Sequence, residues 1–340
     1  MDIVLDTNIF FSDFLMNATK FKLAFDYLKK TNSKIIVPQI VYQEIAALYG
    51  RKLEERFGEF KRDKELLDGI LVDKTKFDFK IDFNGEVENY KTYFKNKLKI
   101  QNKDIIPYEN KYLNEIVNRA LCRKKPCTDK GQEFRDVLLW LTVLDIAKLL
   151  KTKELIFISN NTHNFSSGEC SLHSTLLKDA EDAGLKINYY ESIDHFIKAH
   201  AVKIDFITKD WLDSEIDMGI VDQAIIDKLD ESDGEKLRER AESREHEQTT
   251  GYFNTISPDV EIDDFYIYEK TDGSYYVEAN YYGEVEVEFE FIYKEEIDEG
   301  ISRYRTETRT KCLSIEIWVT FGIEIKDKKI SNFEIIDWEF

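Results

Sequence analysis

Short apolar runs separated by helical patterns most constrain the fold of the first two hundred residues. Residues 3–5, 34–37 and 155–158 form three such runs, and polar residues follow the first and third directly. Runs that are this short and almost entirely apolar are typical of strands buried in a parallel sheet. Strands that alternate with helices predict a sheet with helices on both faces. We therefore expect an α/β domain over residues 1–205, with a helical and loop insertion at about residues 50–115.

The hydrophobic pattern changes to a period of two after about residue 251. Val285, Val287 and Phe289 alternate with glutamates, which predicts strands that have one buried and one wet face. A small antiparallel, β-rich domain is expected over residues 251–340. Residues 206–250 have a helical pattern that ends in a densely charged run, and we expect them to form an acidic connector.

The formal net charge of -19 is distributed unevenly. Residues 1–200 hold 32 Lys and Arg against 30 Asp and Glu, whereas residues 201–340 hold 16 against 37. The first part can therefore attract nucleic acid, and the acidic second part would repel it. The acidic domain could restrain the first domain, bind a regulatory protein partner, form a homo-oligomer or simply favour solubility.

Cysteine and histidine predict no metal site. The four cysteines are far apart and the five histidines have no ligand spacing, so any metal chemistry must use oxygen ligands. No apolar run approaches the roughly 20 residues that a membrane helix needs, and the first residues lack the layout of a signal peptide. These features predict a cytoplasmic protein with no membrane partner.

Polar residues at the ends of the predicted strands are candidates for a functional site. Asp6 and Asn8 follow the first strand, and Ser159, Asn160 and Asn161 follow the strand that ends at residue 158. Ligands bind at the carboxyl ends of parallel strands, so these residues are expected at one edge. Glu44 and Asp136, on nearby helices, would add two carboxylates. Hard divalent cations such as Mg²⁺ and Mn²⁺ prefer such oxygen ligands.

Each of these residues alone also has an ordinary structural role. Asp6 could cap a helix, and Glu44 could be an exposed helix residue. Asp136 could form an ion pair with Arg135. Asn161 is common in turns for its own backbone preference. These alternatives stay open at the level of the single residue.

The order of the residues resembles that of PIN-domain nucleases, in particular the long prokaryotic variants that carry an insertion, over about residues 1–195. Asp6, Glu44 and Asp136 match the first three acidic positions of the family. The last motif of the family usually contains an aspartate. In this sequence, Asn161 and Asn164 stand in its place.

This resemblance implies a nuclease that cuts phosphodiester bonds with one or two Mg²⁺ or Mn²⁺ ions. Asp6, Glu44 and Asp136 would be catalytic residues and metal ligands, with Asn161 or Asn164 as alternative amide ligands. Asn8, Ser159 and Asn160 would be auxiliary residues of the site. The products would carry a 5'-phosphate and a 3'-hydroxyl.

The resemblance also bears on the substrate and the role of the protein. It favours single-stranded or structured RNA over DNA, and a toxin or defence effector as the biological role. The missing aspartate leaves a second hypothesis, in which a catalytically weakened PIN fold serves as an RNA-binding or assembly module.

A nucleic-acid backbone needs cations near such an acidic site. A basic run leads up to Asp136 and provides candidates: Arg119, Arg123, Lys124, Lys125, Lys130 and Arg135. A second run, Lys95, Lys97, Lys99 and Lys103, lies in the insertion. Ordinary solvated charge is the alternative for both runs.

Overall fold

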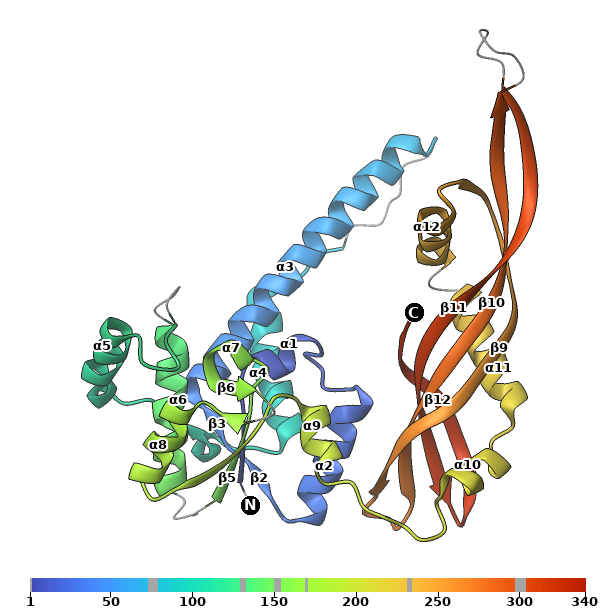
Figure 1. Ribbon diagram of the computed structural model, residues 1–340. Coiled ribbons are helices and arrows are strands. Elements are labelled where there is room, and N and C mark those ends of the chain that lie inside the picture. The colour runs from blue at the N-terminus through green and yellow to red at the C-terminus, as the bar shows by residue number, and fades with distance from the viewer. Residues whose placement is uncertain are drawn as a thin grey trace. The chain divides into compact units, whose positions relative to one another are not determined.

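The computed structural model describes residues 2–72, 79–128, 133–149, 154–168, 171–230, 234–296 and 304–340. The chain divides into two compact units, Met1–His200 and Ala201–Phe340. Figure 1 labels most of their helices and strands. In the described part of the chain, none of the helices has the length and apolar character needed to cross a bilayer.

A four-stranded parallel sheet forms the centre of the first unit. It comprises β1 (Asp2–Leu5), β2 (Lys34–Ile35), β5 (Glu154–Ile158) and β8 (Lys186–Tyr190), in the order β2-β1-β5-β8. Every neighbouring pair is parallel. Leu5 at the end of β1 pairs with Ile158 at the end of β5, so the residues that follow these strands emerge side by side.

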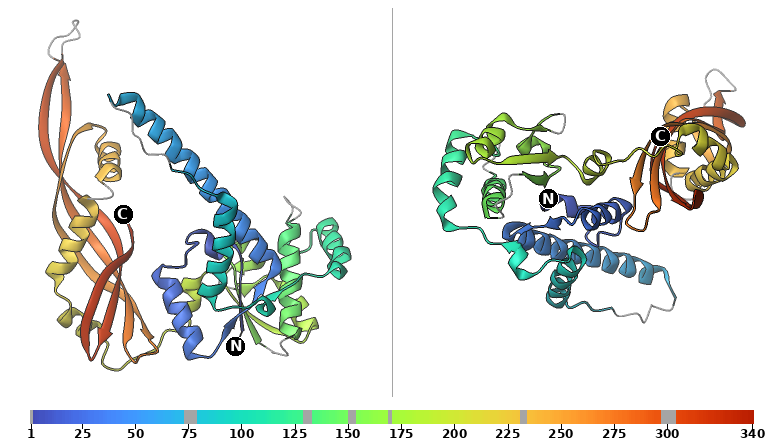
Figure 2. Two further views of the ribbon diagram at one scale, coloured as in Figure 1. Left: turned by 180° about the vertical axis from the view of Figure 1, so that it is seen from behind. Right: turned by 90° about the horizontal axis from the view of Figure 1, so that it is seen from below.

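Helices cover both faces of this sheet (Figure 2). Ile3, Leu5 and Ile158 pack on one face against α2 (Thr19–Lys30) and α9 (Ile193–Lys198). Phe157 points to the opposite face because successive side chains alternate along a strand. Its ring lies 6.3 Å from that of Trp140, which belongs to α6 (Phe134–Leu149). The predicted α/β fold with flanked parallel strands is confirmed.

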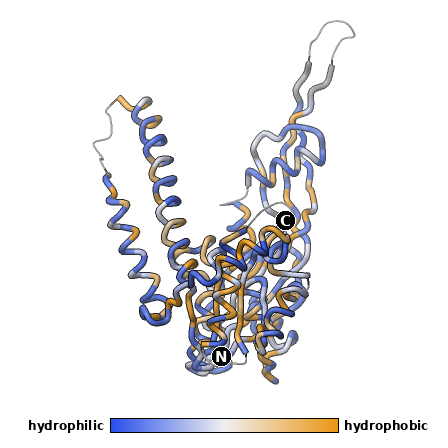
Figure 3. Tube along the Cα trace, turned by 90° about the vertical axis from the view of Figure 1, so that its left-hand side faces the viewer, coloured by the Kyte–Doolittle hydropathy of each residue, from blue (hydrophilic) through white to orange (hydrophobic). Residues whose placement is uncertain are grey.

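Two long helices form most of the predicted insertion. The first, α3 (Gln39–Ile70), contains Glu44 and continues far beyond residue 50, and α4 (Phe83–Leu98) packs along it. The rings of Tyr49 and Tyr90 stack at 4.1 Å between the two helices. Figure 3 shows the hydropathy along this pair and along the apolar strands of the sheet. The shorter elements of the unit are α1 (Asn8–Phe11), β3 (Val37–Pro38), η1 (Asn102–Asp104), β4 (Ile105–Ile106), η2 (Asn110–Tyr112), α5 (Leu113–Cys122), α7 (Thr162–Phe165), β6 (Ser166–Gly168), β7 (Ser171–Leu172) and α8 (Ser174–Asp182).

An antiparallel sheet dominates the second unit, as the sequence predicts. Its strands are β9 (Gln248–Glu269), β10 (Tyr275–Glu296), β11 (Tyr304–Lys326) and β12 (Lys329–Glu339), in the order β12-β11-β10-β9. Val285, Val287 and Phe289 are at most 1% exposed, in agreement with the period-two pattern. Gly273 lies in the turn between β9 and β10 with a φ of 81°, a conformation that favours glycine.

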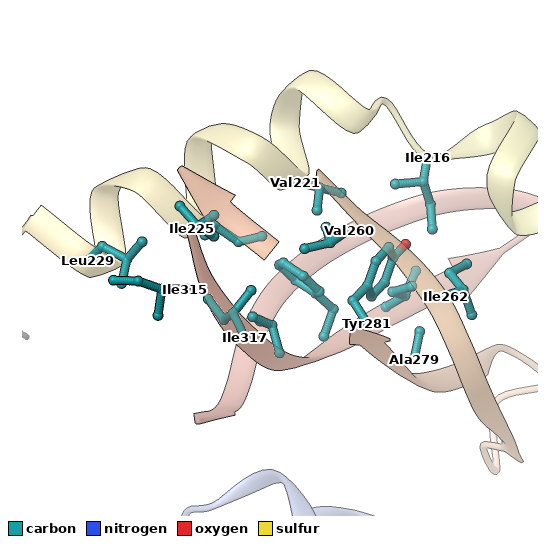
Figure 4. Close-up of a cluster of buried hydrophobic side chains, with 14 of the residues drawn as sticks. Ile216, Val221, Ile225, Leu229, Val260, Ile262, Ala279, Tyr281, Ile315 and Ile317 are labelled. Atoms are coloured by element: carbon teal, nitrogen blue, oxygen red, sulfur yellow. The ribbon is translucent and has the colours of Figure 1, made fainter. Parts of the chain in front are cut away.

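Residues 206–250 are helical, as the sequence predicts, but they belong to the core of the second unit and do not form a connector outside it. This segment forms α10 (Lys209–Glu215), α11 (Met218–Lys228) and α12 (Gly234–Glu245), and these helices share one apolar core with the sheet. Figure 4 shows Ile225 of α11 and Leu229, which directly follows this helix, near Ile315 and Ile317 of β11. Even the charged α12 buries Leu237 completely. The helices cover the apolar face of the sheet, which would otherwise be exposed to water.

Candidate active site

Asp6 lies at the end of β1 in an almost completely buried position, with 5% of its surface exposed. Its backbone N–H donates to the carbonyl oxygen of Ile158 at 2.9 Å, which ties it to the end of β5. The hydroxyl of Ser159 donates to Asp6 Oδ2 at 2.6 Å, and the backbone N–H of Thr7 donates to Oδ1 at 2.6 Å. The N-cap of α1 is Thr7 rather than Asp6. Asp6 therefore has a fixed carboxylate that does not serve as a helix cap.

Asp136 lies in the first turn of α6, and two asparagines reach it from the segment after β5. Asn161 Nδ2 donates to Asp136 Oδ2 at 3.1 Å, and Asn164 Nδ2 donates to the same oxygen. Asn164 is 5% exposed, so this amide is part of the interior. The two asparagines and Asp136 are thus brought together. Their amide nitrogens, not their oxygens, face the carboxylate.

Glu44 lies in the second turn of α3, where it is bound to two side chains. Thr7 Oγ1 donates to Glu44 Oε2 at 3.0 Å, and Arg135 forms an ion pair with Oε1. Arg135 therefore pairs with Glu44 and not with Asp136, its neighbour in the sequence. Thr7 links the Asp6 and Glu44 carboxylates because its backbone binds one and its hydroxyl binds the other. The strand-end pattern pointed to Asp6 and Asn8 but missed Thr7 between them.

The three carboxylates influence one another electrostatically. Burial raises the pKa of Asp6 from 3.8 to about 7. The hydrogen bonds from Ser159 and Thr7 oppose this rise, whereas the charges of Asp136 and Glu44 add to it. Burial also raises the pKa of Asp136, opposed by Asn164 and Arg135 and increased by the charge of Glu44. A cation among these groups would relieve both the repulsion and the cost of burying charge.

The oxygen atoms of these side chains are suitable ligands for a divalent cation, but their present positions do not form a complete metal site. Within the described ranges, no three side chains of His, Cys, Asp or Glu lie close enough together to hold a metal ion as they stand. Each carboxylate is instead satisfied by a hydroxyl, an amide or a guanidinium group. Asn8 Oδ1, however, is buried and accepts no hydrogen bond from a described residue. A buried acceptor without a donor fits a cation or a water bound to one.

The other two auxiliary candidates lie in different surroundings. Ser159 is fully buried and its hydroxyl both donates to Asp6 and accepts from the backbone N–H of Asn161, at 3.2 Å. It therefore couples the ends of β1 and β5. Asn160 is exposed beside it, and the structure gives no contact that assigns it a role.

The basic run before Asp136 is partly structural, which corrects one of its predicted roles. Arg119 is 3% exposed, and its guanidinium group donates to Glu115, to the carbonyl oxygen of Lys125 and to Asp179. It is therefore not available to nucleic acid. The sequence could not show this because Asp179 lies sixty residues further along the chain.

The remaining members of the run differ in their availability. Lys124 pairs with Asp179 at 3.0 Å, and Lys125 Nζ donates to the carbonyl oxygen of His163 at 2.6 Å. Arg123 is exposed, and the Arg135 side chain is 72% exposed although it pairs with Glu44. Lys130 lies outside the described residues. Arg123 and Arg135 are thus the cations of this run that best fit an external phosphate.

Comparison with known protein families identifies the family of the first unit. Residues 3–165 match the family model described as PIN domain. This part of the chain belongs to the PIN-domain family. PIN domains are in general nucleases that act on nucleic acid and usually use divalent metal ions. The chain matches no curated protein and no solved structure. The matched range includes all three carboxylates and both asparagines of the site.

Proposed function

We propose that the first unit is a Mg²⁺- or Mn²⁺-dependent endoribonuclease whose active site contains Asp6, Glu44 and Asp136. The observation that carries this proposal is the grouping of three carboxylates around the ends of β1 and β5, where Thr7 binds both Asp6 and Glu44. Burial raises the pKa of Asp6, and the charges of Asp136 and Glu44 add to this rise. Structural carboxylates are normally placed beside cations and not beside one another. In a PIN domain, such a cluster is best explained as a metal site.

Different side chains would have different roles in the proposed reaction: some would bind the metal ion, and others would position these ligands. Asp6, Glu44 and Asp136 would hold the ion, which when bound lowers the pKa of water and stabilises charge on the phosphate. Asn8, with its buried and unsatisfied Oδ1, would orient a water or the ion. Ser159 and Thr7 hold Asp6 in place. Asn161 and Asn164 would position Asp136, and each amide could rotate to offer its oxygen as a ligand.

Several features support the choice of substrate and setting. The first two hundred residues are almost neutral, and Arg135 is an exposed cation beside Glu44 that could meet a phosphate backbone. Arg123 is also exposed, at the end of α5. The family resemblance favours RNA over DNA and a toxin or defence effector as the role. Cys122, Cys127 and Cys312, the described cysteines, form no disulfide with one another, which is compatible with the proposed cytoplasmic location. The acidic second unit would bind a regulatory protein or form a homo-oligomer.

A cleavage assay tests this function directly. Labelled single-stranded RNA, structured RNA and DNA are incubated with the full chain in Mg²⁺, Mn²⁺ or EDTA. We expect cleavage of RNA that EDTA abolishes, and a loss of about 100-fold or more in Asp6→Asn and Asp136→Asn. Asp210→Asn, an exposed residue of α10 in the second unit, is the matched control. Cleavage that survives EDTA or both active-site substitutions would disprove the proposal.

The two asparagines favour one alternative function. Both direct their Nδ2 groups to Asp136, where the family usually supplies another carboxylate, so the site has one acidic ligand fewer. This suits a catalytically weakened fold that binds RNA or assembles with other proteins. Binding of RNA by the parent chain without cleavage in either metal would favour this alternative. Replacement of Asn161 or Asn164 by Asp would then be expected to raise metal affinity.

A further inference from the structure

A cavity of about 540 Å³ lies at the β2 edge of the first unit's sheet. Its walls come from the end of α2, from Lys34 and Ile35 of β2, and from the segment that follows α4. Lys34 begins β2 and pairs with Asp2 at the start of β1. Asp6 follows the carboxyl end of β1, so the cavity and the candidate active site lie at opposite ends of the strands. It is a separate feature of the same unit.

The cavity combines an apolar floor with a basic rim. Its floor contains Phe25, Leu28, Ile35, Leu98 and Ile100. Five lysines line the rim: Lys29, Lys34, Lys97, Lys99 and Lys103. Among the described residues that line it, Asp104 is the one carboxylate, and its Oδ2 already accepts the backbone N–H of Gln101 at 2.8 Å. The surroundings therefore have a strong positive potential.

Helix ends explain only part of this basic rim. Lys29 and Lys97 lie in the last turns of α2 and α4, where a cation interacts favourably with the helix dipole. Lys97 Nζ also donates to Asn17 Oδ1 at 2.8 Å. Lys99 is the C-cap of α4, where the dipole also favours a cation, but Lys34 and Lys103 lie outside the α-helices of this unit and the dipole does not account for them. These three lysines come from two segments that only the fold brings together.

Lys99 adds a second observation. It ends α4 in the left-handed region, with a φ of 55°, and Asn32 on the opposite wall has a φ of 51°. Glycine is the residue usually favoured where a helix ends in this way, and a lysine costs about 1 kcal/mol more. A cationic side chain is therefore present at the mouth of the cavity, at a position whose backbone conformation favours glycine.

We propose that this cavity binds a nucleotide, with its phosphate at the lysine rim and its base on the apolar floor beside Phe25. Ammonium groups bind phosphate oxygens, and an aromatic ring offers a stacking surface for a base. The ligand is either a free nucleoside triphosphate or one nucleotide of an RNA strand, because the two share this chemistry. The proposal stands independently of the nuclease function, since none of the three carboxylates lines the cavity.

Binding measurements on the full chain test the proposal. Isothermal titration in EDTA uses three probes: ATP, inorganic triphosphate and a short single-stranded RNA. EDTA prevents metal-dependent cleavage, and Asp6→Asn is measured in parallel to separate this site from the nuclease site. We expect ATP to bind more tightly than inorganic triphosphate because only ATP can use the apolar floor. Asp6→Asn should bind ATP like the parent chain.

Two variants are matched to the geometry. Lys99→Gly removes a charge while it relieves the left-handed backbone, so it should fold at least as stably as the parent. The double variant Lys34→Gln, Lys103→Gln removes charge from both walls. Each should weaken binding of the preferred probe, by about tenfold for the double variant. Lys22→Gln, an exposed residue of α2 that does not line the cavity, is the control and should bind normally.

The outcomes separate clearly. Stronger binding of ATP than of RNA identifies a free nucleotide as the ligand, and the reverse identifies the substrate strand, provided that the lysine variants weaken it. Equal binding of ATP and inorganic triphosphate would overturn the assignment of a nucleotide. Binding by none of the probes, or undiminished binding in both lysine variants, would overturn the site itself.

Discussion

The two units of the chain differ in where they bury polar side chains. The first unit gathers Asp6, Thr7, Ser159 and Asn164 in the interior around the ends of β1 and β5. In the second unit, the buried polar residues among those described are Thr255 and Ser274, whose hydroxyls donate to Asp230 and Asp272 respectively.

The interiors of the two units therefore differ in their energetic cost. A buried polar group costs about 1–3 kcal/mol unless it is hydrogen-bonded, so a chain gains nothing in stability from concentrating such groups at one edge. The first unit accepts this cost where a metal site is proposed. The second unit keeps its many carboxylates outside and buries an apolar layer between helices and sheet. We therefore expect the catalytic site to lie in the first unit. The second unit is expected to have a stable apolar core and a charged surface.

The largest expected effect tests the apolar core of the second unit. Ile225 of α11 is 0% exposed, so Ile225→Ala should lower the free energy of unfolding by about 2–5 kcal/mol. Ile220 on the same helix is 56% exposed, and Ile220→Ala should change it by less than about 0.5 kcal/mol. Urea unfolding of the full chain measures both. Equal effects would mean that α11 is a connector after all.

Titration of Asp6 gives the next effect and concerns the first unit. Its pKa is about 7 in the folded chain against an ordinary 3.8, so the folded state retains a proton that the unfolded state loses between these values. Stability in EDTA should therefore fall as the pH rises from 4 to 8. Asp6→Asn removes this cost and should be more stable than the parent at pH 8, by up to about 4 kcal/mol.

The control for this experiment is the same comparison at low pH. Near pH 3, Asp6 is protonated in both states, and the advantage of Asp6→Asn should disappear. Asp210→Asn should show no such pH dependence. A parent chain as stable as Asp6→Asn at pH 8 would mean that Asp6 is not buried as a costly carboxylate, and the contrast between the units would lose its main support.

A smaller effect concerns Arg135, which occupies a cation's place beside Glu44. Arg135→Gln removes this competing charge, so the affinity for Mn²⁺ should rise several-fold, equivalent to about 1 kcal/mol. Binding of RNA should weaken because an exposed cation is lost. Titration calorimetry with Mn²⁺ and with RNA measures the two opposite changes. Arg135→Lys keeps the charge and should lie between; a fall in Mn²⁺ affinity in Arg135→Gln would contradict the proposed competition.

Local patterns predicted the elements of the fold, but long-range contacts decided several roles. The apolar runs before Asp6 and Ser159 predicted strands, and the position of both residues at strand ends predicted that they meet. Arg119 was placed on the surface because its partner Asp179 is distant in sequence. Residues 206–250 looked like a connector because no local pattern reveals which surface their apolar residues cover.

The same limit applies to the cations of the insertion. The sequence predicts Lys99 and Lys103 to be part of a basic run that either binds nucleic acid or is ordinary solvated charge. Nothing in this run indicates that Lys34 lies beside them. Their juxtaposition depends on α4 returning to the β2 edge. At both the site and the cavity, the sequence shows which residue types are present. It does not show which distant segments come into contact.

The smallest expected effect tests Thr7, which couples two carboxylates of the first unit. Thr7 is 4% exposed, and its hydroxyl donates to Glu44 Oε2 at 3.0 Å. Thr7→Val keeps the shape but removes this donor, at a cost of about 0.5–1.5 kcal/mol. Because Glu44 would lose its fixed position, cleavage should fall several-fold, with a weaker affinity for Mn²⁺. Thr7→Ser restores the hydroxyl and should restore both, whereas equal values in Thr7→Val and the parent would mean that Arg135 alone positions Glu44.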